Sequence, residues 1–303
     1  MSARTFLVFI DGIGWGQPDP ATNPQYSYGG QLLRLPVAEG ETPVAIAGGG
    51  WARPIDAVLG VPGVPQSATG QTTLLSGVSG QGALGKHLTG FPNEKLREIL
   101  LEHSILKTLT ERGQRAAFLN AFRPRFWELS RERQLTLSAT TVANLAADLP
   151  FFGLDDIRAG RSIYQEMTNT ELKERGFDLE PLAPAEAGRI AGRTARQYDF
   201  LLYEYFQTDK AGHSGEMARS EAELRLVDEF LQAVLAELKA ELAEETLIVL
   251  TSDHGNLEDG TTRRHTTNPI PLLAWGKGAR EFVAGVTRLD QVTPQILTRH
   301  EVR

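Results

Sequence analysis

The 303-residue chain is long enough to bury one large core, with or without an inserted segment. It contains no cysteine, which excludes disulfides, thiolate metal sites and cysteine nucleophiles, so any metal must be held by oxygen and imidazole ligands. The formal charge of −7 argues against a nucleic-acid surface, and no stretch approaches the roughly 20 apolar residues that cross a bilayer. We therefore expect a cytoplasmic protein without nucleic-acid or membrane partners.

The first predicted element is a buried strand at residues 6–10, which runs directly into Asp11. The glycines that follow have the spacing G-x-G-x-G and not the G-x-G-x-x-G of a dinucleotide loop, and residues 17–28 do not open a helix. We therefore interpret Asp11 as a carboxylate at a strand end, beside glycines that allow the close approach of a ligand or metal.

Residues 17–66 look irregular, and a hydroxyl-rich loop over residues 66–77 then leads into a predicted helix. This loop contains Ser67 and Thr69, followed by Gly70. Because free N–H groups at a helix N-terminus favour anions, the loop is a candidate phosphate site. A hydroxyl that only caps the helix would produce the same pattern.

Apolar residues recur at helical spacing from Leu96 to Leu109, and residues 116–120 are typical of a short strand. A helix followed by a strand continues an α/β alternation.

Residues 123–185 lose that alternation and carry arginines, among them Arg123 and Arg125, near aromatic side chains. We predict a core of residues 1–122 and 186–303, with residues 123–185 inserted as a small cap or lid. Ordinary surface loops and helices are the alternative.

A helix is predicted from Pro184 to Tyr198 and a strand over residues 200–205, followed by Asp209 and His213 in a D-x-x-x-H pattern. Residues four apart share one face of a helical turn, although such polar pairs are usually solvated. At the end of a strand, the pair becomes a candidate for binding a metal.

A capping-box pattern at Ser220 and Glu223 is followed by an amphipathic helix that extends to Leu242. We expect its apolar stripe to pack in the core and not to bind a partner.

The strongest local signal lies at residues 247–256, where a buried strand ends on Asp253 and His254. Parallel sheets place their chemistry at strand C-termini, so this carboxylate and imidazole suggest metal ligands. A turn with a capping aspartate and a surface histidine is the alternative. His265 follows in a polar loop, where a lone histidine is more often a surface residue, directly before a predicted strand at residues 270–275.

All these candidates lie in strand-end loops, and together they would suit two neighbouring divalent cations. Such a pair lowers the pKa of a bound hydroxyl and clamps the attacking and leaving oxygens of a displacement at phosphorus. Aspartate and histidine together suit Mn or Zn better than Ca. The candidates are Asp11, Ser67, Asp209, His213, Asp253, His254 and His265.

The order of the motifs D-G-x-G, S-x-T-G, D-x-x-x-H, D-H-G-N and H-T-x-N-P resembles the alkaline phosphatase superfamily. Residues 208–213, 252–256 and 265–269 are similar almost word for word to its branch of cofactor-independent phosphoglycerate mutase and phosphopentomutase. The resemblance implies an α/β fold, with a three-layer core, a mostly parallel central sheet and a small inserted cap.

The resemblance also implies roles for individual residues. Ser67 would be the nucleophile, ionised by metal contact and then phosphorylated, and Thr69 is the fallback because the loop offers two hydroxyls. The resemblance maps no motif onto residues 123–185; apart from it, Arg123 and Arg125 are candidates for holding a substrate phosphate or carboxylate. Two divalent ions are implied, Mn or Zn with Mg as a third option, one held by Asp11, Ser67, Asp253 and His254 and the other by Asp209, His213 and His265.

The chain departs from the mutases in two ways. Gln71 stands where those enzymes carry a histidine, and the chain lacks the large inserted domain that supplies their substrate-binding arginines. A mutase must keep water from its phosphoenzyme, so a small cap favours hydrolysis. We predict a metal-dependent phosphatase that acts on a small phosphorylated metabolite, with a phosphomutase as the alternative.

Two other classes fit less well. Sulfatases of this superfamily use a C/S-x-P-x-R motif, and residues 67–71 lack both the proline and the arginine. A non-catalytic protein that binds metal and a phosphorylated ligand would have no use for a nucleophile. The sequence gives no indication of oligomeric state.

Overall fold

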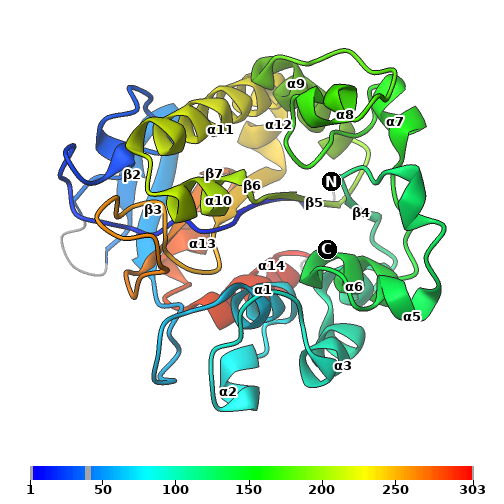
Figure 1. Cartoon of the computed structure of the whole chain (residues 1–303), viewed down its shortest axis with the longest axis horizontal. Coiled ribbons are helices and arrows are strands. Elements are labelled where there is room, and N and C mark those ends of the chain that lie inside the picture. Colours follow the sequence, from blue (N-terminus) through cyan, green and yellow to red (C-terminus); the bar gives the residue numbers. More distant parts are fainter. Residues whose placement is uncertain (1–2, 38–41, 302–303) are drawn as a thin grey trace.

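A computed structural model describes residues 3–37 and 42–301 (Figure 1). Across these described ranges, seven strands form one sheet in the order β2-β3-β7-β6-β1-β5-β4. The strands are β1 (Arg4–Ile10), β2 (Val44–Ile46), β3 (Gly50–Ile55), β4 (Ala116–Phe118), β5 (Phe200–Tyr205), β6 (Thr246–Thr251) and β7 (Ile270–Gly276).

The α-helices lie between and after these strands. They are α1 (Ser67–Ser76), α2 (Gly80–Leu84), α3 (Glu94–His103), α4 (Ile105–Glu111), α5 (Arg131–Gln134), α6 (Ala139–Ala146), α7 (Leu154–Arg158), α8 (Thr170–Glu174), α9 (Pro184–Ala195), α10 (Gln207–Ser214), α11 (Met217–Glu237), α12 (Lys239–Glu244), α13 (Ala279–Ala284) and α14 (Val292–Arg299). Short 3-10 turns are η1 (Pro24–Tyr26), η2 (Ala47–Gly49), η3 (Pro124–Phe126) and η4 (Leu289–Gln291).

The centre of the sheet is parallel, as the sequence predicts. Strand β1 lies between β5 and β6 and runs parallel to both, and β4 continues the parallel set beyond β5. The other edge is antiparallel, since β7 pairs with β6, β3 with β7 and β2 with β3 in opposite directions. The carboxyl ends of β1, β5 and β6 therefore meet at one edge of the sheet.

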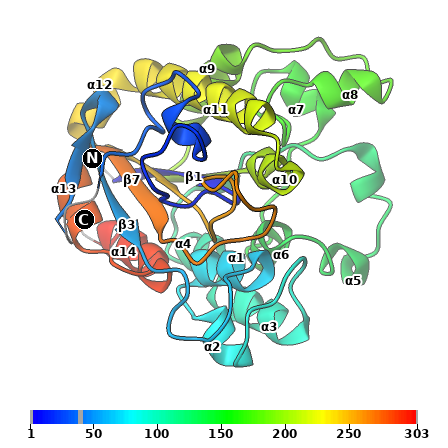
Figure 2. The same ribbon diagram turned by 60° about the vertical axis from the view of Figure 1, so that its left-hand side comes forward.

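Helices cover both faces of the sheet, which gives three layers (Figures 1 and 2). Side chains alternate between the two faces along a strand, so Phe6 and Val8 pack with α9 and α11, whereas Leu7 and Phe9 pack with α1, α3, α4, α6, α13 and α14. Every residue of β1 from Thr5 to Ile10 is buried, as expected for a central parallel strand. The predicted three-layer α/β core is confirmed.

Several predicted elements differ in detail. The helix expected from Leu96 to Leu109 is interrupted at Ser104, whose side chain caps α4 by accepting from the backbone N–H of Lys107. The capping box at Ser220 and Glu223 is wrong, because α11 already begins at Met217 and both residues lie inside it. Strands β2 and β3 lie in the stretch that the sequence analysis took as irregular.

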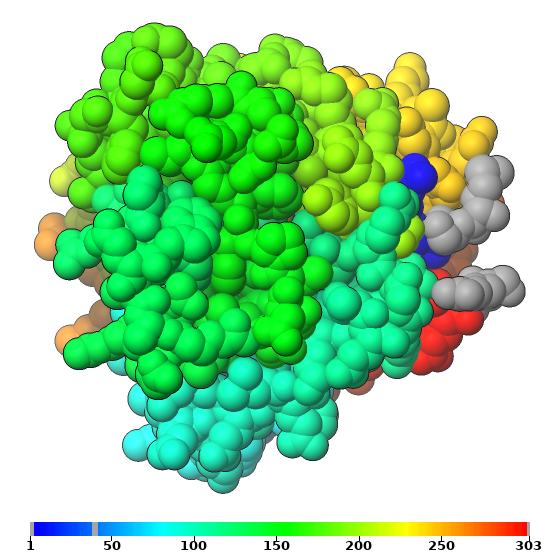
Figure 3. All heavy atoms as spheres, turned by 90° about the vertical axis from the view of Figure 1, so that its right-hand side faces the viewer, coloured from blue at the N-terminus to red at the C-terminus, as the bar shows by residue number. Residues whose placement is uncertain are grey.

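The region predicted as a cap contains two kinds of packing. Helix α6 packs against α1, α3 and α4 and contributes Val142 and Ala143 to the core below the sheet. The later part of the region has a small apolar cluster of its own, which includes Leu154, Tyr164 and Leu172. These segments, green in Figure 3, cover one side of the molecule. The exact limits of the cap at residues 123 and 185 stay a prediction.

Within the ranges that the structure describes, no helix is both long enough and apolar enough to cross a bilayer.

Candidate metal centre

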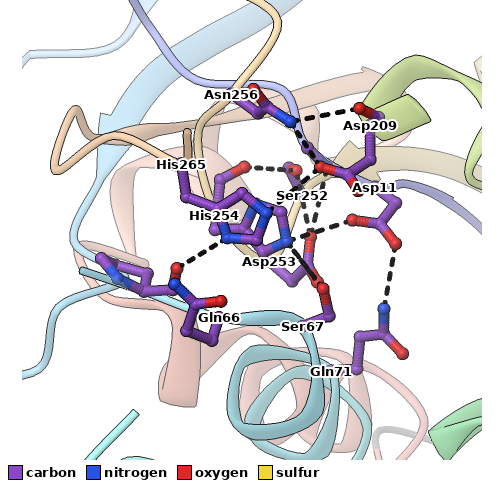
Figure 4. Close-up of polar contacts among 12 residues, drawn as sticks. Asp11, Gln66, Ser67, Gln71, Asp209, Ser252, Asp253, His254, Asn256 and His265 are labelled. Carbon is purple, nitrogen blue, oxygen red and sulfur yellow. Dashed lines mark hydrogen bonds and ion pairs between the residues drawn. The ribbon is translucent and has the colours of Figure 1, made fainter. Parts of the chain in front are cut away.

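The predicted ligands lie at the carboxyl edge of the parallel strands. Asp11 follows β1, Asp253 and His254 follow β6, and Asp209 lies in the first turn of α10, directly after β5. The parallel register aligns Ile10 with the end of β5 and so brings these loops side by side. Figure 4 shows their side chains pointing toward one another.

One cluster, called the enclosed cluster, is almost completely buried. It consists of Asp11, Asp253 and His254, whose ligand atoms all lie within 4.8 Å of one another. His254 Nε2 is 3.2 Å from Asp11 Oδ1 and 3.5 Å from Asp253 Oδ2. The Ser67 hydroxyl joins this cluster, with its Oγ 3.0 Å from His254 Nε2. The structure thus brings together all four residues expected at the first metal.

The second cluster is more open. Asp209, His213 and His265 also have their ligand atoms within 4.8 Å of one another, and each histidine Nε2 lies 3.3–3.4 Å from an Asp209 carboxylate oxygen. The His265 ring stacks on the His254 ring with centroids 3.7 Å apart, so the two clusters are adjacent. All seven predicted positions therefore converge, and their role as ligands stays a prediction.

The donor atoms fit metal ions. In His213 and His265, Nδ1 contacts a backbone carbonyl, at 2.8 and 3.1 Å, and a carbonyl can only accept, so Nδ1 carries the proton. In the neutral rings both Nε2 atoms then present lone pairs, yet they lie 3.1 Å apart, a contact that a shared cation would stabilise. Asp11 Oδ1 and Asp253 Oδ2 are buried and, apart from the His254 ring nitrogen at 3.2 and 3.5 Å, have no hydrogen-bond partner among the described residues. Imidazole and carboxylate donors left open in this way suit divalent cations.

The electrostatics of the enclosed cluster also favour a cation. Burial raises the pKa of Asp11 well above its usual value, and the nearby Asp253 carboxylate raises it further. Burial alone would lower the pKa of His254, but the Asp253 and Asp11 carboxylates outweigh it and raise that pKa to about 10. Without a metal, the cluster recruits a proton to balance its negative charge.

Of the two hydroxyls in the nucleophile loop, only Ser67 contacts the cluster. Ser67 is the first residue of α1, and its Oγ meets the His254 ring. The Thr69 hydroxyl is fully buried, donates to the Gln66 carbonyl at 3.1 Å and accepts from the Leu88 N–H at 3.3 Å. The geometry therefore favours Ser67 over the fallback.

Two glycines allow the segments of the site to pack close together. A Cβ on Gly70 would lie 2.6 Å from the Asp253 carbonyl oxygen, so a larger residue would push α1 away from the β6 loop. Gly12 has a φ of +72°, and a Cβ there would lie 2.7 Å from the Asp209 Cβ. Gly12 thus allows the close approach of Asp209; the approach of a ligand or metal that the sequence predicts stays a prediction.

Two amides orient the carboxylates. The Asn256 side chain donates to Asp209 Oδ1 at 2.7 Å, and the Gln71 side chain donates to Asp11 Oδ2 at 3.1 Å (Figure 4). Gln71, one of the two departures from the mutase pattern, is therefore a direct partner of a candidate ligand. Neither role was deduced from the sequence, because an amide far along the chain carries no mark of its partner.

A buried carboxylate joins three loops of the site. Glu258 accepts from the backbone N–H groups of Gly14 and Asn256 at 2.8 and 2.7 Å, and from the Asn268 side chain at 3.0 Å. It also accepts from the Thr266 hydroxyl. Glu258 therefore ties the loops after β1 and β6 to the His265 loop. The sequence analysis missed it, although it lies two residues beyond the D-H-G-N motif.

A cavity of about 600 Å³ opens beside the clusters. Asp11, Ser67 and Asp209 line it, and so do Arg123 and Arg125, the predicted substrate-binding residues. The cavity wall also contains Lys210 and several phenylalanines, which the sequence analysis did not assign to the site. The candidate nucleophile and the candidate anion-binding arginines thus share one space.

Comparison with known proteins shows which proteins this chain is similar to. Residues 177–303 match the model of the Metalloenzyme superfamily, and this segment carries Asp209, His213, Asp253, His254 and His265. The structure superposes on that of the PH0037 protein from Pyrococcus horikoshii with a TM-score of 0.59. The superposition covers 99% of this chain and 97% of that protein, at 16% sequence identity. The superposition on the alkaline phosphatase of Thermus thermophilus has a TM-score of 0.54 and covers 100% of this chain and 92% of that enzyme, at 12% sequence identity. The fold is that of the alkaline phosphatases, and the resemblance stated from the motifs is confirmed.

The curated proteins that resemble this chain in sequence carry the name of one particular enzyme. The chain is 32% identical over 109 residues to a 2,3-bisphosphoglycerate-independent phosphoglycerate mutase of Acetivibrio thermocellus, covering 34% of this chain and 20% of that protein. It is 33% identical over 130 residues to the enzyme of the same name from Dinoroseobacter shibae, covering 40% of this chain and 25% of that protein. The match thus spans at most a quarter of these mutases.

Proposed function

We propose that this protein is a two-metal-dependent phosphoryl-transfer enzyme that hydrolyses a phosphate ester of a small metabolite through a phosphoserine on Ser67. The observation that carries the proposal is the position of the Ser67 hydroxyl, 3.0 Å from His254 Nε2 and on the wall of the cavity. The alkaline-phosphatase-like fold and the metalloenzyme family match support the same chemistry.

The two candidate clusters would hold the metal ions, with Mn, Zn and Mg as the ions that suit the donors. When bound, such a pair lowers the pKa of a coordinated hydroxyl and stabilises charge on phosphoryl oxygens. The chain itself positions the nucleophile, because Ser67 opens α1 and its Oγ is held against the enclosed cluster. The N-terminus of α1 adds a positive dipole beside the transferring group.

The reaction then has two displacements at phosphorus. Ser67 Oγ bonds to phosphorus as the ester P–O bond breaks, and the alcohol leaves with a proton. Water next bonds to phosphorus, and Ser67 regains its hydroxyl as inorganic phosphate leaves. Arg123 and Arg125 on the cavity wall would hold anionic groups of the substrate.

A phosphomutase is the second candidate, because the curated relatives carry that name. In a mutase the alcohol and not water would take the phosphoryl group back. We favour hydrolysis for two reasons. The matched region covers only 20–25% of the length of those mutases. In addition, Phe91 on the cavity wall is exposed to solvent, so water can reach the cavity.

Product analysis tests the proposal. Wild-type protein is incubated with aryl, sugar and glycerate phosphates in the presence of Mn, Zn or Mg, and both inorganic phosphate and isomerised ester are measured. We expect released phosphate, at least about 1000-fold less in Ser67→Ala, and unchanged release in Thr110→Ala, which removes a hydroxyl on the surface of α4. Isomer without released phosphate would establish the mutase, and equal turnover in Ser67→Ala would refute the nucleophile.

A further inference from the structure

Beyond the metal centre, the cavity wall is mainly apolar. Phenylalanine supplies much of it, from β4, η3 and the loops around Phe91, Phe122 and Phe206. The large apolar lining residues include Phe91, Phe118, Phe122, Phe126, Leu129, Leu137 and Phe206. An active site built only for small, highly charged metabolites has no need of such a wall, because charged and hydroxyl groups would lose hydration against it.

The aromatic part of the wall is preorganised. Phe122 packs on Phe126 with ring centroids 4.4 Å apart, and Phe151 lies 4.8 and 4.6 Å from these two rings. Phe118 joins the group at 6.1 Å from Phe122. Rings held at these spacings lose little conformational entropy when a further apolar group binds.

The exposure of Phe91 also indicates a ligand with an apolar group. Phe91 is 63% exposed. Among the described residues it is one of three large apolar residues that are exposed, together with Val37 and Trp127. Unlike those two, Phe91 lines the cavity beside Ser67. A large apolar side chain that remains in contact with water at the wall of a cavity is typical of a binding surface for an apolar group.

Polar groups also line the cavity, among them Arg123 and Arg125, and two of the others are already engaged with neighbouring side chains. The Lys210 ammonium lies 4.6 Å from the centroid of the Phe206 ring. The Glu204 carboxyl is buried and accepts from the Thr140 hydroxyl at 2.6 Å, and burial raises its pKa to about 7. Near neutral pH a large fraction of Glu204 is therefore uncharged, which keeps this part of the wall weakly polar.

The volume agrees with a bulky ligand. Pockets of roughly 300–1,000 Å³ enclose drug-sized molecules with apolar walls and a small number of orienting polar groups. The cavity of about 600 Å³ falls within that range. A three-carbon phosphate would leave most of it to water.

We propose, on the basis of the proposed function, that the substrate is a phosphate ester of a bulky apolar alcohol of aromatic size. The phosphate lies at Ser67, and the apolar group lies against Phe91, Phe122 and Phe126. Hydrolysis breaks the ester P–O bond, water supplies the new oxygen on phosphorus, and the apolar alcohol leaves with a proton.

Kinetics with matched esters test this assignment. Hydrolysis of 2-naphthyl phosphate, 3-phosphoglycerate and methyl phosphate is compared in the Mn-loaded wild type, Phe91→Ala and Val37→Ala. We expect a KM for the naphthyl ester at least about tenfold below those of the small esters. Phe91→Ala should raise only the naphthyl KM, by about fivefold, with kcat kept within about twofold. Val37→Ala removes an equally exposed apolar residue that does not line the cavity, so it should change neither.

A binding measurement separates this inference from the proposed function. The fluorescence of 2-naphthol, the free alcohol, reports binding to the same three proteins without any turnover. Saturable binding that Phe91→Ala weakens and Val37→Ala does not supports the apolar site even if no ester is hydrolysed. Rapid hydrolysis of the small esters, with no naphthyl preference and no naphthol binding, would overturn the inference and leave the phosphatase proposal intact.

Discussion

The two halves of the candidate metal centre use similar donors in different surroundings. The side chains of His254 and Asp253 are fully buried, and that half contains the Ser67 hydroxyl. In the other half, the His213 side chain is 46% exposed, although His265 is only 6% exposed. Burial strengthens electrostatic interactions and excludes competing water, so the enclosed half is suited to chemistry and tight retention. The open half is suited to exchange of its ion and contact with substrate.

The largest effect should come from removing a donor of the enclosed half. We expect His254→Gln, which keeps much of the side-chain volume, to lower kcat/KM by roughly 1000-fold or more and to lose one bound metal per chain. The physical reason is that His254 contacts both buried carboxylates and Ser67, the proposed nucleophile.

Metal content by mass spectrometry and phosphate release measure this effect, and circular dichroism serves as the folding control. A variant that keeps two metals and its turnover would show that the enclosed half is not a metal site.

The same experiment on the open half should give a weaker and reversible effect. His213→Gln removes a largely exposed donor, so we expect an activity loss of about 100-fold at low metal that excess Mn restores to within about tenfold. Turnover is measured as a function of Mn concentration. Equal behaviour of His254→Gln and His213→Gln, with neither rescued, would remove the distinction between the halves.

The orienting amides should have smaller effects still. Gln71→Leu and Asn256→Leu each remove one hydrogen bond to a candidate ligand, on the enclosed and open halves respectively, so we expect a loss of about 10–100-fold in metal affinity. Gln71→Glu is the matched contrast, because it places a carboxylate against Asp11 and should be worse than Gln71→Leu. Competition with a fluorescent chelator measures the affinities, and wild-type affinity in both leucine variants would contradict the orienting role.

The smallest effect concerns a histidine whose burial outweighs the influence of a nearby carboxylate, Asp199. His300 packs with its Nε2 3.0 Å from the Thr5 hydroxyl, and burial and the neighbouring Arg299 lower its pKa to about 4. Between pH 6.5 and 4 the unfolded chain binds a proton that the native state does not, so stability falls as the pH decreases through this window.

We expect His300→Gln to reduce that loss by about 1–2 kcal/mol, measured by urea unfolding at pH 7.5 and 4.5 in the presence of a chelator. The same pH dependence in the variant and the wild type would contradict this assignment. His254 behaves oppositely, because the Asp253 and Asp11 carboxylates outweigh its burial and raise its pKa to about 10.

The core of the site was predictable because its signals are local. A buried strand followed by Asp11 or by Asp253 can be recognised from a single segment, and parallel pairing then brings these segments to one edge. The helical start at Ser67 and the four-residue spacing of Asp209 and His213 are local in the same way.

The parts that were missed depend on packing between distant segments. Gln71 meets Asp11 across 60 positions, and the strands β2 and β3 form an antiparallel edge whose residues show little alternation. The aromatic wall arises because Phe91 and Phe126 reach one cavity from separate loops. Helix α6 belongs to the core layer because of its partners α1, α3 and α4, which its own sequence does not reveal.

The Glu258 carboxylate has a consequence for how the ions arrive. Since it already fastens three loops by hydrogen bonds, the conformational freedom of those loops is lost when the chain folds and not when an ion binds. In the proposed enzyme, we expect the polypeptide to act as a rigid chelator with its donors in position. Loading and stripping would then be ligand exchange on a folded scaffold, open to different divalent ions according to their supply.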